Sequence, residues 1–147
     1  MHTMIWRRRK KLHKHHLTRE PSTRSEALAY CPVKSREVLE EVLEGGALIL
    51  TYPLVIRPWL AGVAQRLGMG STEPITRRLQ LDEMGSLTWR LLDGRRTVQD
   101  VVDCLCSRYK LNRRETEVAT TGFLRELGKR GLIALRSPHE EDREQSL

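Results

Sequence analysis

The side chains most suited to catalysis or metal binding are few in this chain, and their spacing assembles no reactive set. Cys104 and Cys106 stand two residues apart in a predicted helix, so their side chains point about 200° apart around its axis and do not easily share a metal. Cys31 lies far from them in the sequence, and an odd number of cysteines does not indicate a disulfide framework. The cysteines are therefore interpreted as small core or surface residues.

The histidines and glycines do not indicate catalysis either. His13, His15 and His16 could bind a metal weakly, but nothing in their segment predicts a rigid geometry. Gly68 and Gly70 lack the rest of a dinucleotide-binding fingerprint and do not follow a predicted strand. Because the sequence also lacks an evident nucleophile with a base, a carboxylate pair or a phosphate loop, it predicts a protein that is not an enzyme and holds no metal or cofactor.

Positive charge is concentrated at the N-terminus. Residues 1–24 hold eight Lys or Arg and one acid, whereas residues 25–147 hold 18 basic and 18 acidic residues. The pI of about 9.8 is thus a property of the N-terminal segment and does not indicate nucleic-acid binding by the folded part.

Both ends of the chain are interpreted as tails. Residues 1–36 are predicted to be a basic, disordered tail, and residues 136–147 a polar C-terminal tail. Two alternatives for the N-terminal tail stay open. It could bind nucleic acid or anionic lipid, with Ile5 and Trp6 as a short apolar anchor, or it could result from a start codon upstream of the natural one.

No segment of the sequence is suited to a membrane or to secretion. The longest apolar run, residues 47–56, is shorter than the roughly 20 residues that a transmembrane helix needs. The basic N-terminus lacks the apolar stretch of a secretory signal. We therefore expect a cytoplasmic protein.

A β-hairpin is predicted where the folded part begins, near Glu37. Gly45 and Gly46 separate two β-favouring runs, and a Gly-Gly pair suits a tight turn because both residues can take positive φ. A helix over residues 37–44 remains an alternative, since Glu and Leu favour helix. Residues 54–75 then form an insertion with a predicted helix after Pro58, and a short strand is expected at about 76–81.

Three amphipathic helices follow this strand. Asp82 is a candidate cap for the first, Thr97 and Asp100 form a capping-box pattern for the second, and Asn112 with Glu115 repeats the device for the third. The side of the third helix predicted to be buried carries Val118, Ala119, Phe123, Leu124 and Leu127. Residues 132–135, after the third helix, are expected to form a short strand or extended stretch. The fold class is therefore α+β, with a short N-terminal antiparallel β-sheet followed by a winged-helix-like bundle of three helices.

Two kinds of binding protein fit this order of elements. A helix-turn-helix protein would use residues 112–131 as its recognition helix, with basic side chains on phosphates: Arg113, Arg114, Arg125, Lys129 and Arg130. Those cations are also balanced by Glu115, Glu117 and Glu126, and the hairpin precedes the helices instead of following them. A short sheet with an open edge beside a helix would instead accept an extended peptide as an additional strand.

Residues 81–133 hold a set of short motifs in a characteristic order and spacing: Leu81, Leu91–Gly94, Thr97–Val98, Tyr109, Glu117–Val118, Phe123–Leu124, Leu127 and Gly131–Leu132. In this order and spacing the region resembles the family of PqqD, the protein D of pyrroloquinoline quinone synthesis, which is related to the recognition elements of ribosomally made, modified peptides. The run "GGALILTYPL" resembles the strand that precedes this region in the family.

The resemblance implies a non-catalytic adaptor over residues 37–135, which binds a precursor peptide and presents it to a modifying enzyme, in some cases a radical S-adenosylmethionine enzyme. The peptide would pair with residues 77–81 and lie against the exposed side of residues 116–128. The insertion at 54–75 departs from the family, which usually has a short turn there. The residues implied to bind peptide are Arg77, Arg78, Leu79, Gln80, Leu81, Thr120, Thr121, Leu124 and Arg125.

Overall fold

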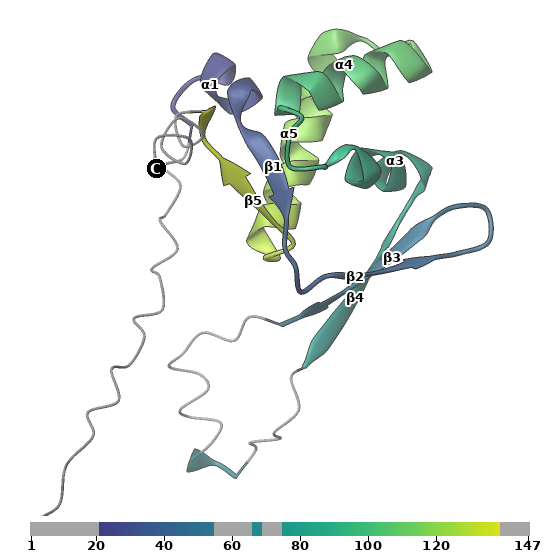
Figure 1. Ribbon diagram of the computed structural model, residues 1–147, viewed down its shortest axis with the longest axis vertical. Coiled ribbons are helices and arrows are strands. Elements are labelled where there is room, and N and C mark those ends of the chain that lie inside the picture. Colours follow the sequence, from purple (N-terminus) through teal and green to yellow (C-terminus); the bar gives the residue numbers. More distant parts are fainter. Residues whose placement is uncertain (1–20, 55–65, 69–74, 139–147) are drawn as a thin grey trace, which may run out of the picture.

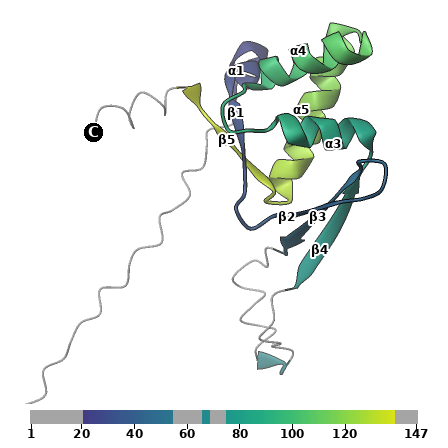
Figure 2. The ribbon, with the colours of Figure 1, turned by 45° about the vertical axis from the view of Figure 1, so that its right-hand side comes forward.

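The computed structural model describes residues 21–54, 66–68 and 75–138, which form an α+β fold (Figure 1). Within these residues a three-stranded antiparallel sheet in the order β2-β3-β4 packs below a group of helices. A two-stranded sheet of β1 and β5 lies beside the helices, as a second view confirms (Figure 2). The predicted fold class is confirmed.

The predicted hairpin and the strand after the insertion are both present. β2 (Leu39–Val42) and β3 (Leu48–Pro53) flank a turn in which Gly45 and Gly46 each have a φ of +87°, a conformation that a side chain would disfavour. β4 (Thr76–Leu81) pairs with β3 along its whole length. The helix expected after Pro58 falls almost entirely outside the described residues.

The register of the sheet shows which backbone groups of β4 remain available. Leu54 N donates to Ile75 O at 2.7 Å, so this pair is a hydrogen-bonded one, and in an antiparallel ladder such pairs recur at every second residue. Arg77, Leu79 and Leu81 therefore bond to β3. The N–H and C=O groups of Thr76, Arg78 and Gln80 point outward, and no described strand lies on that side. β4 is thus an open sheet edge.

Side-chain caps fix the helices where the sequence predicts them. Asp82 accepts from Gly85 N at 2.7 Å and begins α3 (Glu83–Leu91). Thr97 and Asp100 form the full capping box of α4 (Val98–Tyr109). Asn112 accepts from Glu115 N at 3.2 Å and begins α5 (Arg113–Lys129).

The core lies where the inner face of the sheet meets the helices. Trp89 is fully buried at its centre, and its indole N–H donates to the carboxylate of Glu40 on β2 at 2.8 Å. Leu48, Leu50 and Tyr52 alternate on the buried face of β3. The bond from Trp89 to Glu40 joins α3 to the sheet. No helix in the described part of the chain is long and apolar enough to cross a membrane.

We expect Thr97→Ala to lower the free energy of unfolding by about 1 kcal/mol, because it removes the acceptor for Asp100 N and leaves that amide without its cap. Urea denaturation followed by circular dichroism measures the change. Ser107→Ala, an exposed position on the same helix, is the control and should cost much less. Equal losses in the two variants would show that the capping box contributes nothing.

The described fold begins earlier than the predicted boundary near Glu37. α1 (Arg24–Ala29) and β1 (Cys31–Lys34) lie within the expected tail of residues 1–36, and β5 (Ile133–Arg136) enters the expected C-terminal tail by one residue. β1 pairs with β5 from the far end of the domain, and α1 contacts α4. The prediction of a tail is wrong for these residues, because their order depends on contacts with distant segments and not on local apolar periodicity.

Candidate functional site

A groove of about 550 Å³ lies between β4, the start of α3 and one side of α5. Its lining is mostly apolar, and its polar residues come from β4, α3 with its cap, and α5. The apolar lining residues are Leu79, Leu81, Met84, Leu105, Leu111, Ala119, Phe123 and Leu127. The polar ones are Gln80, Asp82, Thr88, Glu115, Thr116, Thr120, Glu126 and Arg130.

Two contacts fix how α5 runs along this groove. Arg130, which caps the C-terminus of α5, donates to the Tyr52 hydroxyl at 3.2 Å, and Tyr52 is paired with Arg77 near the start of β4. At the other end of β4, a Cβ on Gly85 would lie 3.6 Å from the Phe123 ring and 3.0 Å from the Asp82 carboxylate. α5 therefore runs beside β4 in the opposite direction, and the absence of a side chain at Gly85 permits the close approach of α3.

The structure brings only some of the predicted peptide-binding residues to this groove. Leu79, Gln80, Leu81 and Thr120 line it. Arg77 is exposed at its far end, and Arg78 lies on the outer face of the sheet in an ion pair with Glu41 at 2.9 Å. Their role in peptide binding stays a prediction.

The other predicted residues on α5 face elsewhere. Leu124 is buried in the core, and the Thr121 hydroxyl donates to the Glu117 carbonyl of its own helix at 2.7 Å. Arg125 is exposed and does not line the groove.

The prediction of the buried side of α5 is confirmed for Leu124 and Leu127 and wrong for Val118 and Ala119. Val118 is 59% exposed, and Ala119 is exposed in the groove wall, whereas Thr116, Glu117 and Thr120 are buried. Ala119 is an exposed groove residue that the prediction assigned to the core, whereas Phe123 packs against the core and also lines the groove. Glu115, Ala119 and Phe123 follow one another at intervals of four residues, so they lie on one side of the helix. This spacing could have indicated that the three residues share one surface.

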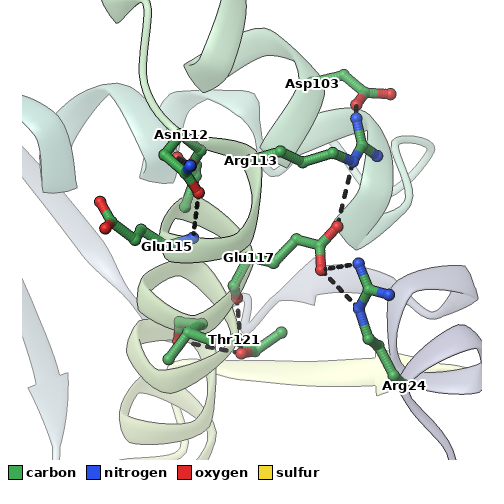
Figure 3. A network of polar contacts seen from close by, with 9 residues as sticks. Arg24, Asp103, Asn112, Arg113, Glu115, Glu117 and Thr121 are labelled. Atoms are coloured by element: carbon green, nitrogen blue, oxygen red, sulfur yellow. Dashed lines mark hydrogen bonds and ion pairs between the residues drawn. The ribbon is translucent and has the colours of Figure 1, made fainter.

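A buried carboxylate ties the N-terminal helix to α5 on the side away from the groove (Figure 3). Glu117, only 3% exposed, accepts from Arg24 Nε at 2.7 Å and from Arg113 Nε at 3.2 Å, and Arg113 also bonds to Asp103 at 2.6 Å. The hydrogen bond from Arg24, with a further contribution from Arg113, holds the pKa of the Glu117 carboxyl below its ordinary value. This network connects α1, α4 and α5.

Glu117→Gln is expected to destabilise the fold at neutral pH and to do so less in acid. Because the folded-state pKa of Glu117 is depressed, its ionised form stabilises the fold above the unfolded-state pKa of about 4.3. That stability is lost as the pH falls through the lower folded-state value. Urea denaturation at the two pH values should therefore show that the free energies of unfolding of wild type and variant differ more at pH 7 than at pH 3.

Glu115→Gln is the matched control for this prediction. Glu115 lies on the same helix, but no hydrogen bond or ion pair joins its carboxylate to the described part of the chain. Its substitution should change stability little at either pH. If Glu117→Gln lowers the free energy of unfolding by the same amount at pH 3 and at pH 7, the role assigned to the ionised carboxylate is contradicted.

The same network bears on the helix-turn-helix alternative. Arg113, the first of the cations assigned to phosphate contacts, is engaged by Asp103 and Glu117, and Lys129 is paired with Glu126 at 3.0 Å. Over the described residues no group of three or more His, Cys, Asp or Glu is arranged to hold a metal ion. The groove beside β4 is accordingly the feature best suited to bind a ligand.

Comparison with known proteins gives a match over the region of the groove. Residues 74–133 match the family model described as Coenzyme PQQ synthesis protein D (PqqD). No curated protein matches the chain. A solved structure described as "TbiB1 in Complex with the TbiA(beta) Leader Peptide" is 23% identical with a TM-score of 0.48, and the similarity covers 69% of this chain and 93% of that chain.

Proposed function

We propose that the protein, whose residues 74–133 match the PqqD family model, binds the leader part of a precursor peptide as an additional strand on β4 and presents it to a modifying enzyme. Members of this family are generally non-catalytic peptide chaperones, and the proposal gives this chain no reaction of its own. Its setting would be the synthesis of a cofactor or of another modified, ribosomally made peptide.

The observation that carries the proposal is the open edge of β4 beside an apolar groove. The outward N–H and C=O groups of Arg78 and Gln80 can pair with an extended backbone, as in strand-addition complexes. Alternate side chains of that strand would then project toward α5, over Leu79, Leu81 and Phe123. Backbone pairing supplies affinity for any extended peptide, while the groove selects among side chains.

We expect the partner enzyme to modify the precursor peptide while the leader part of that peptide is bound to this protein. A radical S-adenosylmethionine enzyme is one such partner, from the family resemblance. An added strand would occupy the groove with only part of its length, so the segment to be modified would extend beyond the domain and remain accessible.

The proposal is tested with peptides encoded near the protein's own gene. Each short open reading frame that flanks the gene is produced as a labelled peptide, and its binding to the full chain is measured by fluorescence anisotropy. At least one should bind, and its binding should depend on the outward donor of Gln80, as argued in the Discussion. If no flanking peptide binds in that way, the proposed function is wrong.

A further inference from the structure

The groove has opposite charge at its two ends. At the end formed by the start of α3, the carboxylates of Asp82 and Glu115 line it, and no ion pair within the described residues neutralises them. At the other end, Arg130 lines it beside the exposed Arg77. Glu126 also lies near that end, but it is paired with Lys129.

The dimensions of an added strand match this separation of charge. Glu115 and Arg130 are roughly 22 Å apart along the helix axis, at about 1.5 Å a residue. In an extended strand, side chains on one face recur every two residues, and six residues span about 20 Å. A peptide could therefore place one charged side chain at each end of the groove and two apolar side chains between them.

The register of β4 defines which peptide positions face the groove. Arg77, Leu79 and Leu81 share the face of the sheet that carries the buried Leu48, Leu50 and Tyr52. Peptide residues opposite them would lie in non-hydrogen-bonded pairs, where cross-strand side chains approach most closely. We take the added strand as antiparallel, as in every strand pair described here, because that pairing is the more stable one.

We propose that the groove selects an extended peptide with a basic side chain, two apolar side chains at alternate positions and an acidic side chain six residues after the basic one. The basic side chain lies at Asp82 and Glu115, the apolar pair lies over Leu81 and Leu79, and the acidic side chain lies at Arg130. This specificity rests on the proposed function, since it presupposes that a strand pairs with β4.

A selection from a phage-displayed library of random peptides on the immobilised full chain tests the charge order. The peptides enriched on the wild type should carry Lys or Arg six residues before Asp or Glu, with apolar residues at the alternate positions between. Selection on the charge-swapped variant Glu115→Lys/Arg130→Glu should lose this charge order, because Asp82 and Arg77 remain and leave one charge of each sign at each end of the groove. The matched control Glu44→Lys/Arg95→Glu moves the same charges at exposed positions outside the groove and should keep the wild-type order.

Synthetic peptides from this selection then give the size of the effect. Exchange of the acidic and basic residues should weaken binding to the wild type roughly tenfold at low salt, a size expected of two exposed ion pairs turned into repulsions. The difference should largely disappear at about 1 M salt, where the Debye length is about 3 Å. Since Arg130 also bonds to Tyr52, circular dichroism must show that the double variant is folded; Glu115→Lys alone should still lose the preference for a basic residue.

The outcomes separate this inference from the function on which it rests. The selected peptides could depend on the outward N–H of Gln80 and yet show no charge order, or show the same order on the charge-swapped variant. Either result would overturn the inference on charge but would leave the strand addition to β4 unaffected. Peptides that bind without regard to Gln80 would overturn both.

Discussion

Replacing Gln80 by proline is expected to weaken peptide binding at least about 30-fold while the domain stays folded. The Gln80 N–H points away from β3, so a proline there removes a donor to the added strand without breaking the β3–β4 ladder. An unmade backbone hydrogen bond that leaves a buried acceptor unsatisfied costs about 2 kcal/mol, which corresponds to this factor in affinity. Fluorescence anisotropy with a labelled peptide measures it.

Two variants control for this change. Gln80→Ala keeps the backbone donor and should bind nearly as well as the wild type. Leu79→Pro removes a donor that bonds to β3 and should lower stability itself, which circular dichroism and urea denaturation detect. If Gln80→Pro is folded and binds within about threefold of Gln80→Ala, then the edge of β4 does not pair with the peptide.

Ala119→Trp is expected to reduce peptide affinity by at least about 30-fold, because the indole would fill the groove between α5 and β4. Ala119 is exposed and lines the groove, so the larger side chain need not disturb the core. Blocking the central apolar contacts of an interface typically costs about 2 kcal/mol or more. The same anisotropy measurement applies.

Val118→Trp provides the matched control, since Val118 is next in the chain, is 59% exposed and does not line the groove. This variant adds the same indole to the same helix and should leave affinity within a few-fold of the wild type. Equal losses from both substitutions would mean that the peptide does not lie between β4 and α5.

The elements that the sequence predicts well are those set by neighbouring residues. The Gly45–Gly46 turn, the Thr97–Asp100 capping box and the strand at 76–81 each depend on local conformational preferences, and all three are present. α1 and β1 could not be found in this way. Arg24 stabilises α1 through Glu117, 93 residues away, and β1 pairs with β5 at the other end of the fold.

The sequence predicted the groove only in part, because some of its geometry depends on contacts between distant segments. The strand that borders the groove follows from the sequence and the family resemblance, and Leu79, Gln80, Leu81 and Thr120 do line it. The full orientation of α5 does not follow, because its buried side also carries polar residues such as Thr116 and Glu117. The Thr116 hydroxyl donates to the Asn112 carbonyl at the start of the helix, and Glu117 accepts from Arg24 on the distant α1. Hydrophobic periodicity therefore assigned Val118 and Ala119 to the core, although both are exposed.

The central claim, that a peptide adds as a strand to β4, is tested most directly by residue-level amide hydrogen exchange of the full chain with and without the tightest peptide from the library selection. The amides of Arg78 and Gln80, which point outward, should become strongly protected when the peptide binds. Those of Leu79 and Leu81 already bond to β3 and should change little. Protection confined to residues 54–75, with Arg78 and Gln80 unchanged, would contradict the account and identify the insertion as the binding site.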